Sequence, residues 1–219
     1  MRRQRVGVLI SGRGSNMEAL IRAAAEKNYP AEVATVISDR PDAAGLETAQ
    51  AQGVEAMCID PKACAGREAF EASLQEQLQS KGVELIACAG FMRIFSDGFA
   101  MRWHGRMVNI HPSLLPSYRG LDTHARALAD GVKLHGCTVH FVSGAVDAGP
   151  IIAQSALPVL PEDTADELAR RVLRLEHELY PMVLSWLASG AVSLKDGRVA
   201  YRFAVKDQTR LLSPMSSAE

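Results

Sequence analysis

The chain has 219 residues, of which 47% are hydrophobic and 22% are charged, and its formal net charge is −1. This length suits one α/β domain, which on folding would bury roughly 70% of the surface of the unfolded chain. The near-neutral charge excludes the basic excess of nucleic-acid-binding proteins, and no segment reaches the ~18 consecutive apolar residues of a membrane span, so we expect neither nucleic acid nor membrane as a partner.

Short β-rich runs alternate with helical patterns along the chain. The predicted strands cover residues 6–11, 32–38, 54–59, 83–89, 107–110, 135–143 and 151–157. The predicted helices cover residues 16–26, 42–51, 67–81, 96–102, 123–130 and 164–188, and Pro181 is expected to kink or split the last of these. Residues 195–198, KDGR, predict a hairpin turn between two short final strands.

This alternation predicts the fold class α/β, a Rossmann-like, doubly wound and mostly parallel sheet with antiparallel strands in the C-terminal half. The chain is expected to form a single domain over residues 1–219, with a core at about 5–202 and a C-terminal tail at 203–219, frayed from Ser213 onward. In such sheets, ligands bind at the carboxyl ends of the strands. The residues that follow each strand are therefore the candidates for chemistry.

The first predicted strand leads into SGRGSN, residues 11–16, and then into a helix. Glycines let the backbone approach a ligand, and the unpaired N–H groups at the helix start favour a phosphate. Two alternatives remain open. Ser15 and Glu18 have the spacing of a capping box that needs no ligand. Asp39 could hold the ribose of NAD, although Met17 stands where the dinucleotide fingerprint has its third glycine.

A second candidate lies in the sequence MVNIHPSLLP, residues 107–116. Asn109 and His111 have the same parity, so both point to one side of the strand, and Pro112 and Pro116 then prevent the strand from continuing. An amide and an imidazole on stiff backbone suit the stabilisation of an oxyanion and the transfer of a proton. The alternative is a histidine that only caps the strand end. The Leu115–Pro116 bond could be cis.

The third candidate is the turn VDAGP, residues 146–150. A carboxylate before Gly-Pro is usually turn chemistry, because its side chain bonds its own backbone. Asp147 has a functional interpretation only if it reaches His111, where it would hold the ring and favour the charged imidazole.

Seven sequence blocks connect these candidates. They are SGRGSN, AGFMRI at 89–94, NIHPSLLP at 109–116, Gly120 with Thr123 and His124, HGCTVHFV at 135–142, DAGPII at 147–152 and EHELYP at 176–181. In this order and near this spacing they resemble the phosphoribosylglycinamide formyltransferase family over residues 5–202, a formyltetrahydrofolate-dependent group. The resemblance implies a single formyltransferase domain. It also implies transfer of the formyl group of 10-formyltetrahydrofolate, the co-substrate, to the primary amine of glycinamide ribonucleotide in purine biosynthesis.

The resemblance also implies residue roles. The catalytic residues would be Asn109, His111 and Asp147; the residues binding glycinamide ribonucleotide would be Gly14, Ser15, Asn16, Met17 and Glu176; and the folate-binding residues would be Arg67, Met92, Arg93, Ile94 and Phe95 together with Asn109 and Asp147. Simpler interpretations remain for three sets. Arg67 could be only solvated, Glu176 could pair with Arg171 or Arg174 on its helix surface, and Met92, Ile94 and Phe95 could be core.

Related formyl-folate enzymes are the main alternatives. Methionyl-tRNA formyltransferase carries a C-terminal RNA-binding domain, for which the residues after 202 would leave no room, and formyltetrahydrofolate deformylase adds an N-terminal domain before the first strand. Neither would explain SGRGSN. An NAD-linked dehydrogenase rests only on G-x-G and Asp39, and a non-catalytic nucleotide-binding module is the simplest alternative.

Metal chemistry is not expected, because no H-E-x-x-H or comparable spacing occurs. His135 and His140 are interpreted as structural histidines, and Glu176-His177-Glu178 resembles a ligand set in composition only. Four scattered cysteines without a C-x-x-C pair indicate reduced thiols and a cytoplasmic location. The expected partners are the two small-molecule substrates, and the expected assembly is a monomer or homodimer.

Overall fold

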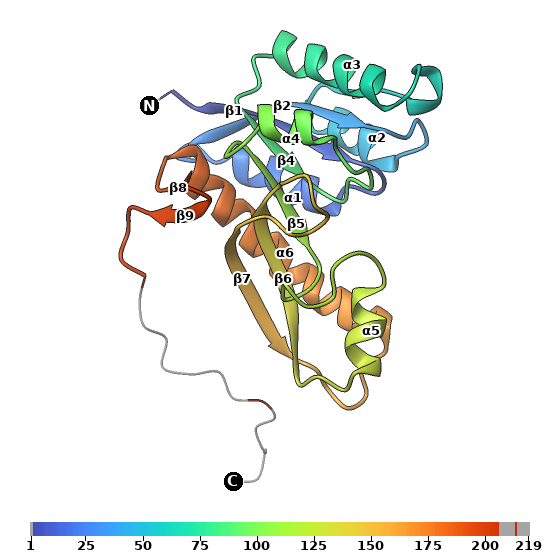
Figure 1. The fold of residues 1–219 in the computed structure, drawn as a ribbon, viewed down its shortest axis with the longest axis vertical. Helices are drawn as coiled ribbons and strands as arrows, with labels where there is room; N and C mark the ends of the chain where they lie inside the picture. Colours follow the sequence, from blue (N-terminus) through green and yellow to red (C-terminus); the bar gives the residue numbers. More distant parts are fainter. Residues whose placement is uncertain (1, 206–212, 214–219) are drawn as a thin grey trace.

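The computed structural model describes residues 2–205 and 213, and within them seven strands form one sheet in the order β3-β2-β1-β4-β5-β6-β7 (Figure 1). The strands are β1 Gln4–Ile10, β2 Ala31–Ser38, β3 Ala56–Cys58, β4 Leu85–Cys88, β5 Met107–His111, β6 Leu134–Phe141 and β7 Ile151–Pro158. Strands β1 to β5 are parallel, whereas β6 runs antiparallel to both β5 and β7. The predicted fold class is confirmed.

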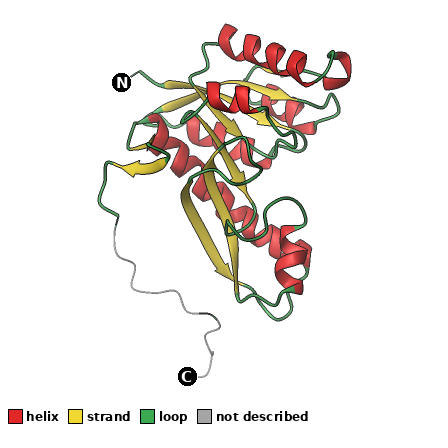
Figure 2. Ribbon diagram, viewed as in Figure 1, coloured by secondary structure: helices red, strands yellow, loops and turns green. Residues whose placement is uncertain are grey.

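Six α-helices lie in the described part of the chain, on the two faces of the sheet (Figure 2). They are α1 Ser15–Ala24, α2 Ala44–Ala51, α3 Arg67–Ser80, α4 Asp97–Arg102, α5 Thr123–Ala129 and α6 Ala165–Ala188, and a 3₁₀ turn, η1 Pro61–Ala63, was not predicted. Side chains of α1, α2 and α6 share one core with the sheet, and side chains of α3 and α4 share the other. No described helix is long and apolar enough to cross a membrane.

The alternation of side chains along β1 builds both cores. Val6, Val8 and Ile10 belong to the core beneath α1 and α6, and Leu9 belongs to the core beneath α3. At Gly7, which also faces α3, an added Cβ would lie 2.6 Å from Leu78 Cδ2. Glycine therefore lets α3 pack closely on the strand, as expected where backbone and helix approach each other.

Helix α6 begins with a capping box and continues through Pro181, so of the two expected effects, a kink or a split, the split is wrong. Thr164 accepts a bond from the Glu167 N–H, and the Glu167 carboxylate accepts one from the Thr164 N–H. A proline inside a helix costs about 3 kcal/mol. Burial of Tyr180, Val183 and other apolar side chains beside it contributes about 1.5–3 kcal/mol each, which offsets that cost.

A two-stranded hairpin follows α6, with β8 Val192–Lys195 paired to β9 Arg198–Tyr201. Asp196 and Gly197 both have positive φ, at 48° and 73°, as a tight two-residue turn requires. The turn predicted at residues 195–198 is confirmed. The predicted fraying of the tail falls on residues 213–219, all but one of which are outside the described residues.

Candidate active site

The loops after β1, β4 and β5 carry most of the predicted site residues, and these three strands are neighbours in the sheet. The chain continues from β1 to β2 on one side and from β4 to β5 on the other, so the strand order reverses between β1 and β4. The Ser11 N–H donates to the Gly90 carbonyl at 3.1 Å, so the first two loops touch. Ligands of open α/β sheets bind at such a reversal.

Asn109 and His111 lie on the same side of β5, as the strand period predicts. His111 is the last residue of β5, paired with Thr138, and Asn109 is paired with His140. Their neighbours Val108 and Ile110 face the core beneath α6. The amide and the imidazole therefore lie on the opposite face of the sheet. The strand was predicted to end at residue 110, but it ends at His111, so the histidine is part of the strand.

Asp147 reaches this face from the loop between β6 and β7. Its Oδ2 lies 3.3 Å from His111 Nδ1 and accepts a hydrogen bond from the Gly120 N–H at 2.9 Å. Its backbone has a positive φ of 47°, a conformation that Asp and Asn tolerate better than most residues. The structure thus brings together the three side chains that the resemblance grouped.

His140 joins the same cluster, which sequence reasoning missed. Its Nδ1 lies 2.9 Å from the Phe141 carbonyl, and its Nε2 lies 3.1 Å from Asn109 Nδ2. Burial lowers the pKa of His140, which favours the neutral ring. Because the carbonyl can only accept, the neutral ring donates through Nδ1 and accepts the Asn109 amide through Nε2. One N–H of the amide is then fixed on His140, and the other is directed elsewhere.

The loop from Pro112 to Asp122 covers the cluster. The Tyr118 carbonyl lies 2.9 Å from His111 Nε2, so both ring nitrogens of His111 face acceptors. Only the protonated imidazole donates to both. Leu115–Pro116 is cis, and Thr138 Oγ1 accepts from the Leu115 N–H at 3.0 Å. The loop is thereby attached to β6 beside the histidine.

The loop after β1 leads into α1 through Gly14, which has a positive φ of 77° and is the N-cap residue. No side chain caps this helix, so the capping box considered for Ser15 and Glu18 is wrong. The first N–H groups of α1 are free of the intrahelical bonds that begin one turn later. An added Cβ on Gly45 of α2 would lie 3.0 Å from the Gly12 carbonyl, so the glycine lets α2 pack directly against this loop.

Asn16 and Glu176, which are 160 residues apart in sequence, meet at the start of α1. Asn16 Nδ2 donates to Glu176 Oε2 at 2.6 Å, and both side chains are buried. Burial raises the pKa of Glu176, and the bond from Asn16 opposes that shift. The considered surface ion pair with Arg171 or Arg174 is therefore wrong. Asn16 Oδ1 is buried and has no hydrogen-bond partner in the described part of the chain.

Met17, the third residue of α1, differs from Ser15 and Asn16. Its side chain is fully buried in the core beneath α6, so only its backbone N–H is directed to the helix start. Asp39, the candidate NAD ribose ligand, already has a partner within the protein, because its Oδ1 accepts a hydrogen bond from Ser11 Oγ at 2.5 Å.

The predicted folate residues divide between surface and core. Met92 and Ile94 follow β4 and are 68% and 60% exposed, which excludes a core role for them, whereas Phe95 is buried. Arg93 is exposed, with its guanidinium 5.1 Å from the centre of the Phe70 ring. Arg67 is an exposed residue at the start of α3. This loop thus presents two apolar side chains and backbone groups to solvent beside the loop after β1.

Comparison with known proteins identifies the family. A family model described as formyl transferase matches residues 4–184. Phosphoribosylglycinamide formyltransferase of Escherichia coli (strain K12) is 41% identical over 189 residues, which cover 86% of this chain and 89% of that protein. The chain belongs to the formyl transferase family.

Solved structures of this formyl transferase family have the same fold. Glycinamide ribonucleotide transformylase 1 from Symbiobacterium toebii matches with a TM-score of 0.88 and 47% identity, covering 91% of this chain and 94% of that chain. A larger relative is the trifunctional purine biosynthetic protein adenosine-3 of Bos taurus, which is 44% identical over 201 residues. This chain spans 20% of that protein's length. The predicted resemblance is confirmed at the level of the family.

A second pair of histidines, His124 and His135, lies beside the cluster of this formyl transferase. His135 Nε2 lies 3.2 Å from His124 Nδ1, and burial lowers the pKa of both rings, that of His135 to about 4, which favours their neutral forms; the structural role of His135 stays a prediction. Within residues 2–205 and 213, no group of three or more His, Cys, Asp or Glu side chains is arranged to hold a metal ion.

Proposed function

We propose that this protein is a phosphoribosylglycinamide formyltransferase. It transfers the formyl group of 10-formyltetrahydrofolate to the primary amine of glycinamide ribonucleotide and releases tetrahydrofolate, in purine biosynthesis. The observation that carries this proposal is the meeting of Asn109, His111 and Asp147 on one face of β5. The loop after β1, with its free helix N–H groups, and the family relatives support it.

The nucleotide is bound at the start of α1. Its phosphate lies against the N–H groups of Ser15, Asn16 and Met17, where the helix dipole favours negative charge. The Glu176 carboxylate accepts hydrogen bonds from the ribose hydroxyls. The unpaired Asn16 Oδ1 accepts one more ligand donor, which removes the cost of leaving a buried acceptor unsatisfied.

The folate is bound across the loop that contains Met92, Arg93, Ile94 and Phe95. Exposed backbone groups recognise the donor and acceptor edges of the pterin, and the apolar side chains of Met92 and Ile94 cover its ring. Arg67, at the outer end of the site, pairs with the glutamate carboxylate of the folate tail. Fixed backbone groups suit recognition of a flat heterocycle because they lose little conformational freedom on binding.

The reaction begins when the amine of the nucleotide attacks the formyl carbon and a tetrahedral intermediate forms. The negative charge on its oxygen is stabilised by the second N–H of the Asn109 amide and by the Nε2–H of protonated His111, which otherwise donates to Tyr118. Asp147 stabilises the imidazolium. The C–N bond to the folate then breaks, and the proton lost by the attacking amine passes to the departing folate nitrogen. Each such donor contributes ~10²–10³ in rate.

A single assay tests the proposal against related enzymes. The purified protein and 10-formyltetrahydrofolate are mixed with glycinamide ribonucleotide, with formyl-accepting tRNA, or with water as the only acceptor, and release of tetrahydrofolate is measured. Rapid release that depends on glycinamide ribonucleotide supports the proposal. Release in water alone would identify a deformylase, and release that requires tRNA would identify the tRNA enzyme. Sedimentation of the same sample tests the expected monomer or homodimer.

A further inference from the structure

The segment Phe91–Phe95 lies between β4 and α4 and is anchored near both ends by hydrogen bonds, at one end to a serine hydroxyl and at the other to a buried carboxylate. At its start, the Met92 N–H donates to Ser11 Oγ at 2.8 Å, and the same hydroxyl donates to Asp39. This anchor lies beside the loop after β1. The first end of the segment is therefore fixed to the nucleotide side of the site.

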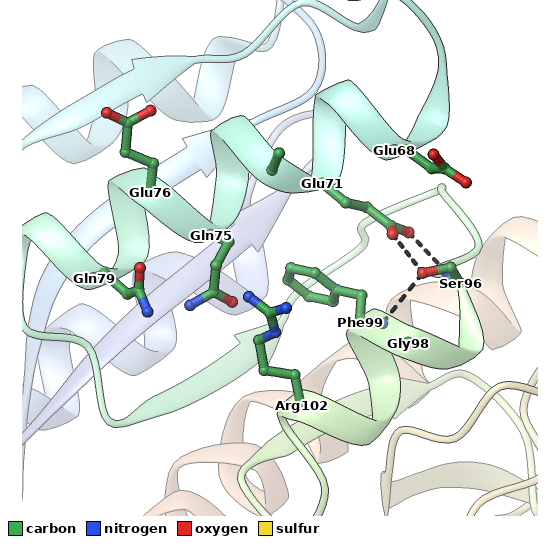
Figure 3. Close-up of a pocket in the computed structure, with 10 residues that line it drawn as sticks. Glu68, Glu71, Gln75, Glu76, Gln79, Ser96, Gly98, Phe99 and Arg102 are labelled. Carbon is green, nitrogen blue, oxygen red and sulfur yellow. Dashed lines mark hydrogen bonds between the residues drawn. The ribbon is translucent and has the colours of Figure 1, made fainter.

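The second anchor is Glu71, in the second turn of α3. Its Oε1 accepts from the Ser96 N–H at 2.7 Å, and its Oε2 accepts from the Ser96 hydroxyl (Figure 3). Ser96 Oγ in turn accepts from the Phe99 N–H at 3.1 Å and caps α4. Glu71 is 8% exposed, although it lies on a helix with many solvated polar side chains. One carboxylate thus fixes both the end of the segment and the start of the next helix.

The segment between these anchors is further ordered by ring stacking. Phe95 is buried between Phe91 and Phe99, with ring centres 5.3 and 4.9 Å apart. Met92 and Ile94 remain exposed between the fixed points. Two large apolar side chains two residues apart on one anchored loop offer apolar area that a bound ligand can bury.

We propose that Glu71 is a positioning residue for the folate site: acting through Ser96, it holds the backbone of residues 91–95 in the conformation that binds 10-formyltetrahydrofolate. This inference rests on the proposed function. Without the carboxylate, the segment keeps its first anchor and the stacked rings but loses the hydrogen bonds that fix its second end, and ordering that end then reduces the free energy of folate binding. We expect nucleotide binding to be unchanged by this loss. Glu71 belongs to α3, which lies on the face of the sheet opposite α1 and α6, where the nucleotide is bound.

The test separates the two substrates. Glu71→Met fills the same space without an acceptor, and Glu71→Gln keeps one oxygen for the Ser96 N–H. Glu76→Ala is the matched control, because Glu76 lies on the same helix and lines the same hollow of about 370 Å³, but is exposed and directed away from Ser96 (Figure 3). We expect Glu71→Met to raise the KM for 10-formyltetrahydrofolate about tenfold, with the KM for the nucleotide and kcat within twofold of wild type. Glu71→Gln should restore most of the loss.

Two results would overturn the inference. One is a Glu71→Met protein, folded by circular dichroism, whose folate KM stays within twofold of wild type. The other is an equal rise in both KM values, which indicates general damage to the fold. Direct calorimetric titration with 10-formyltetrahydrofolate gives the same comparison without an acceptor. A wild-type protein that binds the folate but never formylates the nucleotide would therefore refute the proposed function and leave the role of Glu71 testable.

Discussion

Replacing Asp147 by Asn removes the charge next to His111 and changes little else. The backbone at Asp147 has a positive φ of 47°, which Asn tolerates and Ala does not, so Asn avoids a strain of about 1–2 kcal/mol. The amide oxygen of Asn can still accept from the Gly120 N–H, which Asp147 binds at 2.9 Å. We therefore expect Asp147→Asn to fold and to keep its melting temperature within a few degrees.

The expected loss of activity follows from the geometry. Two unit charges 3.3 Å apart, the separation of Asp147 Oδ2 and His111 Nδ1, interact by about 5 kcal/mol at an effective dielectric constant of about 20. A loss of ~10²–10⁴ in rate, typical for a proton-transfer group, equals about 3–5 kcal/mol. We expect kcat to fall by this factor, with a smaller change in KM for the nucleotide.

The matched control is Asp122→Asn. Asp122 has a φ of 56°, lies on the loop that covers His111, and is exposed. Steady-state formation of tetrahydrofolate measures both variants. If Asp147→Asn retained more than a third of the wild-type kcat, the charge would not stabilise the imidazolium, and the proposed role of Asp147 would be wrong.

Three further substitutions test the surroundings of the site. Glu176→Gln should raise the melting temperature at neutral pH but not at acidic pH. Burial raises the pKa of Glu176, so the ionised wild-type side chain costs stability as pH rises through that pKa, and the neutral amide does not. The same variant should raise the KM for the nucleotide about tenfold or more. His140→Leu should lower kcat ~10–100-fold, because the Asn109 amide loses the acceptor that orients it, at 3.1 Å. Tyr180→Phe should lower the melting temperature by ~2–8 °C without changing kcat, because the buried hydroxyl that donates to the Cys88 carbonyl at 2.9 Å contributes ~1–2 kcal/mol.

Each of these has a contrary result. For Glu176→Gln, it is a difference in melting temperature between variant and wild type that is the same at pH 4 and at pH 8. For His140→Leu, it is a kcat equal to that of wild type in a folded protein. For Tyr180→Phe, it is a fall in kcat as large as the fall expected for His140→Leu, since that would place the hydroxyl in the chemistry.

Local patterns were sufficient to predict the sheet and part of the site. Alternating β-rich and helical runs predicted the doubly wound order, and the parity of Asn109 and His111 predicted that they share a face. The loop after β1 was predicted from its glycines. These features depend on residues within a few positions of each other, where steric preferences and the strand period decide the conformation.

Features set by distant residues could not be predicted in this way. His140 was interpreted as structural because only the antiparallel register of β5 and β6 places it opposite Asn109. The Asn16–Glu176 contact needs α6 to pack on α1, and a surface ion pair was the simpler local interpretation. The capping box failed because Gly14 adopts a left-handed conformation at the N-cap and leaves the helix N–H groups free.

The face of β5 and β6 that carries the cluster is covered by loops, whereas α6 covers the other face. The two segments concerned are residues 112–122 and 142–150, and between them they supply Tyr118, Gly120 and Asp147 to the cluster. Loops accept insertions and deletions that a helix packed on a core does not. The two groups next to the His111 ring, the Asp147 carboxylate and the Tyr118 carbonyl, therefore both lie on segments whose length can change, whereas the ring itself lies on a strand fixed between two others.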